Sequence, residues 1–375
     1  MISVEKIETL EGLDGLRTVW DQLLAKSDFR NIFLTFDWLR TWWKVFGDDR
    51  ELYVLVVKSD AEIIGVAPLM LEKSKRLGRT VKVIKFIGTP NVDYGDFIGE
   101  DKKLIVEHVA GYLYRNRKDW FRVELDQISE RSSTLSHLQV YLGTGKWPFT
   151  TRQIETCLAY VYEGGKEDRS KFKIKRSHSM RRSINRFNDS GGLDITRLDN
   201  PGKVQSELLD LFQLHINRWA ATPTPSKFLD PGQRKFYQEL VEVLFPQNRI
   251  CFIALKNGPL PVAYSFNFEY ENTIYHYTLG HNEYLSRRSP GSLLVILETE
   301  LLIRQGFDLD FSRGAAEYKR LLTNRSYANF QIILYSQRFD FMLTKFIEGI
   351  KSRKITRAIL GNRRLQYHKL KIIGI

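Results

Sequence analysis

The segment that decides the fold is TIYHYTLGHNEYLSRRSPGSLLVILETELLIRQG, residues 273–306. Its first residues alternate aromatic and β-branched side chains with others, which is typical of a strand. A polar loop follows, and an apolar segment of helical length then covers residues 290–304. Pro290 suits the first position of a helix, and Ser289 is a residue type that caps helices. We therefore predict a strand, a loop and a helix in direct succession.

The loop before this helix has the composition of an anion-binding site. Gly291 and Ser292 leave the first backbone amides of the helix accessible, and Arg287 and Arg288 come shortly before it. Unpaired amides, the positive end of the helix dipole and guanidinium groups all favour a bound phosphate or pyrophosphate. The same Ser-Pro-Gly sequence is also ordinary helix capping, so this segment alone leaves both interpretations open.

The rest of the C-terminal half continues the alternation of helices and strands. Apolar periodicity predicts helices over residues 179–190, 203–219 and 231–244. A strand pair over residues 249–270 encloses the polar turn KNGPL. The strand FDLDF follows the helix of the deciding segment.

The N-terminal half shows the same order of elements. Two helices come first, and the aromatic residues between 29 and 43 are predicted to lie mainly in the core. A strand pair over residues 51–72 encloses the polar turn KSDAE, and more strands, a helix and a last strand follow. The predicted helices cover residues 16–24, 35–46 and 101–115, and the later strands lie within 81–99 and 121–128.

The chain length favours two domains, because 375 residues exceed the usual size of one compact core. The Gly-, Thr- and Pro-containing segment YLGTGKWPFTTR, residues 141–152, is predicted to separate them. This gives domains over residues 1–150 and 151–375, each of the mixed α/β class with a mixed sheet. No Gly/Ser-rich linker is present, so we expect the two halves to pack together.

The composition predicts a folded protein of a reducing compartment. Hydrophobic residues make up 43% and charged residues 27% of the chain, as in globular proteins. Neither a signal peptide nor an apolar run of about 18 residues is found, so we expect a cytoplasmic protein that does not span a membrane. The only cysteines, Cys157 and Cys251, allow no cysteine zinc site and are interpreted as buried packing residues. No metal site is predicted.

The net charge of +13 implies an acidic partner. Nucleic acid, anionic lipid and a phosphorylated ligand compete, and solvated basic faces are the alternative to all three. The charge is concentrated in residues 166–186 and 345–371. The second stretch mixes Ile and Leu with Lys and Arg, which suits either peripheral contact with an anionic membrane at its inner face or a packed terminal helix.

Taken together, these segments resemble the GNAT acyltransferases, and more closely the CelD type associated with cellulose biosynthesis. The resemblance covers most of the chain and rests on clusters that occur in the expected order. Leu322 departs from the pattern, because a Trp is more usual before Thr323. The clusters are IIGVAPL at residues 63–69, FIG at 86–88, DYGDF at 93–97, His215 with Arg218 and Trp219, SPG at 289–291, DFSRG at 310–314, and EYK at 317–319.

The resemblance implies two tandem GNAT-like domains and direct transfer of an acyl group from acetyl-CoA or another acyl-CoA. The acceptor would be an amine or hydroxyl of a sugar or polysaccharide precursor, with no metal and no covalent enzyme intermediate. The implied catalytic residues are His215, Asp310, Tyr318 and Lys319, with His276 and Glu317 as further acid or base candidates. The implied donor site comprises Tyr277, Leu279, Arg287, Arg288, Ser289, Gly291 and Ser292, and the implied acceptor site comprises Arg181, Arg218, Trp219, Arg313 and Glu317.

The N-terminal half has no counterpart of the Arg-Arg-Ser-Pro-Gly sequence. We therefore expect one acyl-CoA site per chain, with the N-terminal half helping to form the acceptor cleft. Each candidate also has a structural interpretation: His215 as a hydrogen-bonded helix residue, His276 as a core residue, and Asp310 with Arg313 as a buried ion pair.

Two other functions compete with this one. A Fem-like peptidyltransferase would take an aminoacyl-tRNA donor, and the positive charge would then bind tRNA. A non-catalytic nucleic-acid-binding protein would use the charge alone, but no known nucleic-acid-reading motif is present, so nucleic acid is not expected as a partner.

Overall fold

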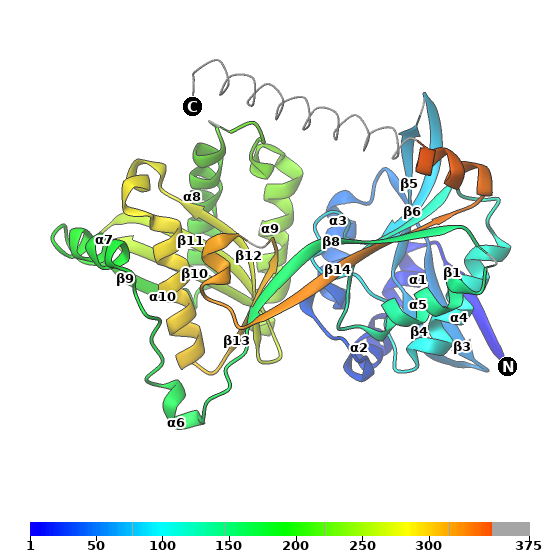
Figure 1. Ribbon diagram of the computed structural model, residues 1–375, viewed down its shortest axis with the longest axis horizontal. Helices are drawn as coiled ribbons and strands as arrows, with labels where there is room; N and C mark the ends of the chain where they lie inside the picture. Colours follow the sequence, from blue (N-terminus) through cyan, green and yellow to red (C-terminus); the bar gives the residue numbers. More distant parts are fainter. Residues whose placement is uncertain (77, 146, 221, 315, 347–375) are drawn as a thin grey trace, which may run out of the picture.

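The computed structural model describes residues 1–346 except 77, 146, 221 and 315. It has two halves that lie side by side, with the N-terminal elements in one and α7 to α11 in the other (Figure 1). A mixed eleven-stranded sheet extends through both halves in the order β2-β5-β6-β7-β14-β8-β13-β12-β11-β10-β9. A separate sheet of the order β1-β3-β4 lies in the N-terminal half.

From α2 to β7 the N-terminal half follows the predicted order of elements, whereas β1, α1 and α5 were not predicted. Helix α5 ends within the segment interpreted as the domain boundary, and the side chain of its N-cap residue Ser132 accepts a hydrogen bond from the backbone N–H of Thr134. The elements are β1 (Ile2–Ile7), α1 (Leu10–Asp14), α2 (Arg17–Lys26), η1 (Ile32–Leu34), α3 (Phe36–Phe46), β2 (Arg50–Leu52), β3 (Val54–Ser59), β4 (Glu62–Ala67), β5 (Leu69–Arg76), β6 (Arg79–Phe86), α4 (Lys102–Arg115), β7 (Arg122–Ser129) and α5 (Ser133–Gly143).

The C-terminal half contains the strand, loop and helix expected for residues 273–306. The loop includes a short 3₁₀ helix, η4, and Ser289 caps α10 through its backbone in the left-handed region at φ 49°, without a side-chain capping bond. The elements are β8 (Phe149–Tyr160), α6 (Lys166–Arg169), α7 (His178–Asn188), β9 (Asp194–Arg197), α8 (Pro201–Trp219), η2 (Lys227–Leu229), α9 (Pro231–Leu244), η3 (Phe245–Gln247), β10 (Ile250–Asn257), β11 (Leu260–Tyr270), β12 (Thr273–His281), η4 (Glu283–Arg288), α10 (Pro290–Arg304), β13 (Asp308–Arg313), α11 (Glu317–Arg320) and β14 (Arg325–Tyr335).

Two long strands join the halves. β14 pairs antiparallel with β7 on one side and with β8 on the other, and β8 pairs with β13 of the C-terminal half. Figure 1 shows both strands running from one half into the other. The predicted boundary at residue 150 falls inside β8, and β14, the last strand within the described residues, pairs with β7 of the N-terminal half. The division into residues 1–150 and 151–375 therefore stays a prediction.

One apolar core extends across the contact between the halves. Phe33 and Trp38 of the N-terminal half are fully buried, and their rings make edge contacts with Tyr275 on β12 and Phe236 on α9. These side chains belong to a single cluster that also includes residues of α8, α9, β10 and β11. The halves pack together as expected, and most of the aromatic residues between 29 and 43 are core residues.

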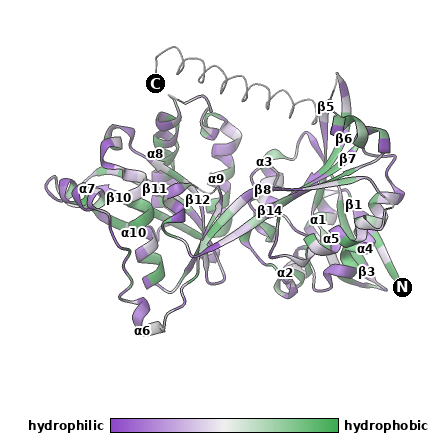
Figure 2. Ribbon diagram, viewed as in Figure 1, coloured by the Kyte–Doolittle hydropathy of each residue, from purple (hydrophilic) through white to green (hydrophobic). Residues whose placement is uncertain are grey.

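The polar surface and the apolar core follow the predicted pattern. α10 is apolar along most of its length and packs against the sheet of the C-terminal half. α7, in contrast, is largely polar (Figure 2). Both cysteines are buried and free. Within the described residues, no helix has the length and apolar character needed to cross a membrane. Most of the basic stretch 345–371 lies outside the described residues.

Candidate active site

The candidate site lies where β12 and β13 separate. The two strands pair in parallel only from Thr273 to Tyr275, opposite Asp308 to Asp310. Beyond Tyr275 the described strands provide β12 with no partner on that side, so backbone polar groups face the gap. Each strand pairs with another strand on its other edge, β12 with β11 and β13 with β8, which holds the gap open.

A β-bulge shapes this part of β12. His276 lies opposite Asn267 of β11 and Thr278 lies opposite Phe266, so Tyr277 is the extra residue. A bulge places two consecutive side chains on one face of a strand. Accordingly, Tyr277 stacks on the ring of Tyr237, and the hydroxyl of Thr278 is hydrogen-bonded to the hydroxyl of the same Tyr237.

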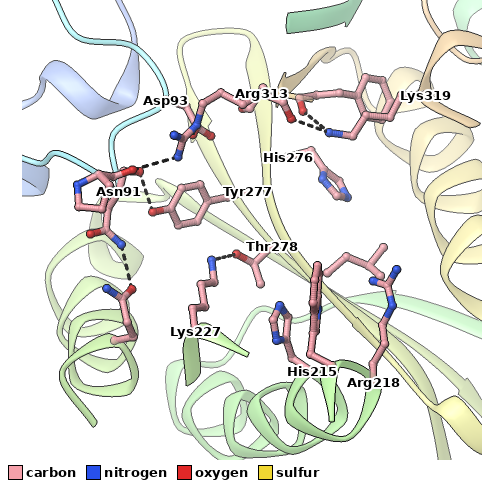
Figure 3. A pocket seen from close by; sticks show the side chains of 16 residues that line it. Asn91, Asp93, His215, Arg218, Lys227, His276, Tyr277, Thr278, Arg313 and Lys319 are labelled. Carbon is pink, nitrogen blue, oxygen red and sulfur yellow. Dashed lines mark hydrogen bonds and ion pairs between the residues drawn. The ribbon is translucent and has the colours of Figure 1, made fainter. Parts of the chain in front are cut away.

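A cavity of about 440 Å³ occupies the gap. Both halves of the chain line it, and Figure 3 shows the side chains converging on the open space from β12, β13, α8, α9 and the loop after β6. The lining residues are Pro90, Asn91, Asp93, His215, Arg218, Trp219, Lys227, Gln233, His276, Tyr277, Thr278, Leu279, Phe311, Ser312, Arg313 and Lys319.

His215 projects from α8 at one wall of this cavity. Its Nδ1 lies 2.7 Å from the hydroxyl oxygen of Ser226, and its ring stacks on Trp219 with centroids 5.7 Å apart. Burial, followed by repulsion from Lys227 and Arg218, lowers the pKa of His215 to about 3. The imidazole is therefore neutral at physiological pH and can act as a hydrogen-bonding group.

Lys227 is the cation closest to the bulge. It begins η2, and its Nζ donates a hydrogen bond to the hydroxyl of Tyr237 at 2.6 Å. The same Nζ donates to the hydroxyl of Thr278 at 2.8 Å (Figure 3). Within the described residues no carboxylate oxygen lies within 4.0 Å of this ammonium group. Burial lowers the pKa of Lys227 to about 7. The charge of Asp93 has a smaller raising effect and that of Arg313 a smaller lowering effect on this pKa. A substantial neutral fraction therefore exists near pH 7, and a neutral amine can accept a proton.

Two ion pairs across the contact between the halves border the cavity. Arg313 pairs with Asp93 and donates to the carbonyl of Pro90 at 3.1 Å. Asp310 pairs with Arg131 at 3.0 Å and accepts a 2.7 Å hydrogen bond from the hydroxyl of Tyr94. The sequence interpretation of Asp310 and Arg313 as partners of each other is therefore wrong, because each faces a different residue of the N-terminal half.

The opposite wall is held by groups buried under the sheet. The Nε2 of His276 lies 3.0 Å from a carboxylate oxygen of Glu298 on α10, and Glu298 also accepts a hydrogen bond from Ser265. Lys319 donates to the carbonyls of Phe311 at 2.8 Å and Arg313 at 3.1 Å, and burial lowers its pKa. These contacts fix the ends of β12 and β13 on either side of the gap.

A second cavity of about 310 Å³ continues from the first one. Arg218 and Leu279 line both cavities, so the two spaces adjoin. The second cavity reaches the N-terminal turn of α10, where it is lined by Ser289, Pro290, Gly291 and Ser292. The structure thus forms a continuous polar groove from the separated strands to a helix N-terminus.

Most of the residues proposed from the sequence lie on this groove. His215, Arg218, Trp219, Tyr277, Leu279, Arg313 and Lys319 line the first cavity, and Leu279, Ser289, Gly291 and Ser292 line the second. Arg287, Arg288 and Ser289 line a third cavity beside it.

Three other candidates, Arg181, Glu317 and Asp310, lie elsewhere, and the side chain of a fourth is not described. Arg181 is exposed on α7, at the end of the C-terminal half that is remote from the N-terminal half (Figure 1). Glu317 is exposed on α11 and lines none of these cavities. Asp310 is 2% exposed and directed at Arg131 and Tyr94 rather than at the cavity. Tyr318 belongs to α11, but its side chain is outside the described part of the structure.

The sequence argument missed several polar residues of the site, among them Lys227, Asn91 and Gln233. Lys227 lies in a short connection between two amphipathic helices and carries no motif of its own. Asn91 and Gln233 hydrogen-bond to each other across the halves at 2.8 Å. Asn91 lies two positions before Asp93, the first residue of the DYGDF cluster. The Gly- and Pro-containing segment 88–93 was therefore the available sequence signal for a loop at the site.

A family model matches part of the chain. Residues 175–320 match the model described as "Acetyltransferase (GNAT) domain", and this range contains most of the groove. No curated protein matches the chain.

Solved structures share the fold over most of the chain. A conserved protein of unknown function from Bacteroides thetaiotaomicron matches with a TM-score of 0.54 and 16% identity, covering 89% of this chain and all of that one. FemX matches with a TM-score of 0.55 and 11% identity, covering 88% and 96%. The C-terminal domain assigned to a lysylphosphatidylglycerol synthetase of Agrobacterium fabrum matches with a TM-score of 0.51 and 11% identity, covering 89% and 96%.

At these identities the solved structures show the fold alone, and the family match adds the type of chemistry. The matched range includes the separated strands, the bulge at Tyr277 and the N-terminus of α10. This chain therefore contains a GNAT acetyltransferase domain, and it is an acyltransferase.

Proposed function

We propose that this protein transfers an acyl group from acyl-CoA to an amine or hydroxyl of a sugar or polysaccharide precursor. The observation that carries the proposal is the continuous groove from the gap between β12 and β13 to the N-terminus of α10. The groove matches the parts of the donor, because a slender polar chain fits between strands and a pyrophosphate fits a helix N-terminus. The specific CelD-type assignment, and with it cellulose or polysaccharide biosynthesis, belongs to this proposal.

The donor pyrophosphate would occupy the second cavity. Gly291 and Ser292 provide the first-turn amides of α10, and Arg218 adds a positive charge where the two cavities meet. A side chain at position 291 would crowd this space, since a Cβ there would lie 3.0 Å from the ring of His281. The thioester would then lie in the first cavity beside the bulge of β12.

The reaction needs three contributions from the protein. The acceptor nitrogen or oxygen attacks the thioester carbonyl carbon, a tetrahedral oxyanion forms, and the C–S bond breaks to release the CoA thiolate. Unpaired backbone N–H groups of β12 near Tyr277 would stabilise the oxyanion. Neutral Lys227 would accept the proton from the attacking group, and the resulting ammonium ion can protonate the leaving thiolate.

The first cavity suits a polar acceptor. Asn91, Asp93 and Gln233 offer hydrogen-bond donors and acceptors, and Trp219 of α8 adds an aromatic ring to the lining of the same cavity. Sugars are bound by this combination, because their hydroxyls need partners and their C–H faces pack on aromatic rings. Any peripheral contact with an anionic membrane remains part of the proposal, since it rests on residues 345–371.

The donor assignment can be tested by calorimetric titration with acetyl-CoA and CoA. The matched variants are Ser292→Asp and Ser292→Asn, in the first turn of α10. Aspartate stabilises a helix N-terminus and so preserves the fold, but it repels a bound phosphate. We expect 1:1 binding to wild type and at least a ~10-fold weaker affinity for the Asp variant than for the Asn variant.

Absence of acetyl-CoA and CoA binding to folded wild type would overturn the donor assignment. Saturable binding of aminoacyl-tRNA in its place would favour the Fem-like alternative. If the donor binds, release of CoA thiol in the presence of amino sugars, compared with the same sugars lacking the amine, tests the acceptor.

A further inference from the structure

A third cavity, of about 250 Å³, lies next to the groove and is lined mainly by arginine and serine. It lies between α7 and the η4 loop, and Ser289 lines both this cavity and the second one. Four guanidinium groups surround it. They belong to Arg182 and Arg186, one turn apart on α7, and to Arg287 and Arg288 at the end of η4.

These four arginines have no acidic partner in the described part of the chain. Within the described residues, none of them lies within 4.0 Å of an Asp or Glu oxygen. By contrast, Arg169 and Arg176 earlier in the same segment pair with Asp308 at 2.6 Å and Glu300 at 3.0 Å. Four arginines that line one cavity without a counter-charge create a positive potential there, so this arrangement favours a bound anion.

The frame that carries these arginines is fixed by local contacts. The hydroxyl of Ser183 donates to the carbonyl of Arg288, and the guanidinium of Arg288 lies 4.9 Å above the ring of Phe187. Phe187 is fully buried in the core of the C-terminal half. The two arginine pairs therefore project from two elements, α7 and η4, that are packed together, although Arg182, Arg186 and Arg287 are exposed.

We propose that the four-arginine cavity binds a phosphomonoester, namely the 3′-phosphate on the adenosine of the CoA donor. The inference rests on the proposed donor site, because the pyrophosphate at α10 brings the adenosine end of CoA to the adjoining space at Ser289. A phosphomonoester carries close to two negative charges, and paired guanidinium groups bind it through several charge-assisted hydrogen bonds. The N-terminal amides of α10 would bind the pyrophosphate, so the separate arginine cluster is left to bind the remaining phosphate of the donor.

The test compares CoA with 3′-dephospho-CoA, which differ only in this phosphate. Wild-type protein is expected to bind CoA about 10- to 100-fold more tightly than 3′-dephospho-CoA. The double variant Arg182→Gln with Arg186→Gln is expected to lose at least ~10-fold in CoA affinity while its affinity for 3′-dephospho-CoA changes by less than ~2-fold.

Arg181→Gln is the matched control. It removes the same charge from the same helix, but Arg181 is exposed and does not line the cavity. The preference for CoA is expected to persist in this variant. A loss of preference equal to that of the double variant would mean a long-range charge effect and would overturn the inference.

The remaining outcomes separate the inference from the function on which it rests. Equal binding of CoA and 3′-dephospho-CoA to wild type would overturn the phosphomonoester site while leaving the donor site intact. Absence of binding of both would overturn the donor assignment. An RNA oligonucleotide that binds wild type but not the double variant, with no difference between the two CoA forms, would assign the arginines to backbone phosphates and refute the proposal.

Discussion

Replacing Lys227 by methionine is expected to stabilise the fold and abolish the activity. Methionine fills a similar volume next to Tyr237 and Tyr277 without a charge. The lysine is half-buried, its Nζ is turned toward two hydroxyls, and its pKa is lowered to about 7 by burial. A lysine with a lowered pKa destabilises the folded state at low pH, because the protonated form is less favourable in the folded than in the unfolded protein.

The size of the expected change in stability follows from the lowered pKa of Lys227. A fall from 10.5 to about 7 corresponds to about 5 kcal/mol at ~1.36 kcal/mol per pH unit. This penalty is fully present below pH 7 and disappears as the pH rises toward 10.5. The two hydrogen bonds offset about 2 kcal/mol at all pH values. Since part of the side chain contacts cavity solvent, we expect Lys227→Met to stabilise the protein by about 2–3 kcal/mol at pH 7.

The sign of the effect should therefore reverse with pH. At pH 10 less than about 1 kcal/mol of the penalty remains, so loss of the hydrogen bonds makes the variant slightly less stable than wild type. Thermal unfolding of both proteins, followed by circular dichroism at pH 7 and pH 10, measures the difference. Transfer activity of the variant at pH 7 is measured in parallel.

One result would refute this reasoning. If Lys227→Met destabilises the protein equally at both pH values, the lysine remains protonated in the fold and serves as a structural cation. Lys227→Arg is the matched control, since guanidinium retains its proton and should be destabilising and inactive at both pH values.

Three further perturbations test other parts of the structure. Arg131→Met leaves the buried carboxylate of Asp310 without its cation and should destabilise the protein by about 3 kcal/mol in thermal unfolding. Arg325→Met, at an exposed ion pair, is the control and should cost less than about 1 kcal/mol. Equal effects of the two variants would contradict the assigned role of the buried pair. Gly280→Ala places a Cβ 2.9 Å from a backbone carbonyl oxygen of α8. The variant should therefore lower the free energy of unfolding by about 1–3 kcal/mol and bind acetyl-CoA more weakly. An unchanged melting temperature would count against the close packing of β12 on α8. His215→Asn should lower the rate of transfer but leave the pH of half-maximal activity unchanged, because burial lowers the pKa of this histidine to about 3. A shifted pH profile would mean that the pH dependence of the activity comes from His215.

Much of the local structure could be predicted from the sequence. α9 and α10 span the same residues as predicted, because proline at the first position and apolar periodicity are signals contained within each helix. Helix α5 was missed, and its last three residues overlap the segment 141–152 whose Gly, Thr and Pro residues indicated a linker. Its stability comes from packing against α4 and the first half of the sheet, which a local pattern does not report.

The candidate site was predictable only in part. Residues of the strand, loop and helix at 273–306 were found because a phosphate-binding helix start has a local signature. Lys227 has no such signature, and its lowered pKa comes from burial among side chains that are distant in sequence. Asp310 was assigned to the cavity from its position at a strand end, whereas Tyr94 and Arg131 of the other half direct it away.

The sequence by itself determined the long helices, the strand pairs and the GNAT-like strand, loop and helix, because these depend on neighbours within a few residues of each other, whereas β1, α5 and β14 were not predicted. The tertiary structure decided how the halves exchange strands β8 and β14, and which residues meet in the cavity between them. Asp93 and Arg313 are partners only because that long-range pairing brings two loops together. Contacts of this kind depend on the packing of whole strands, and no local pattern of side chains encodes them.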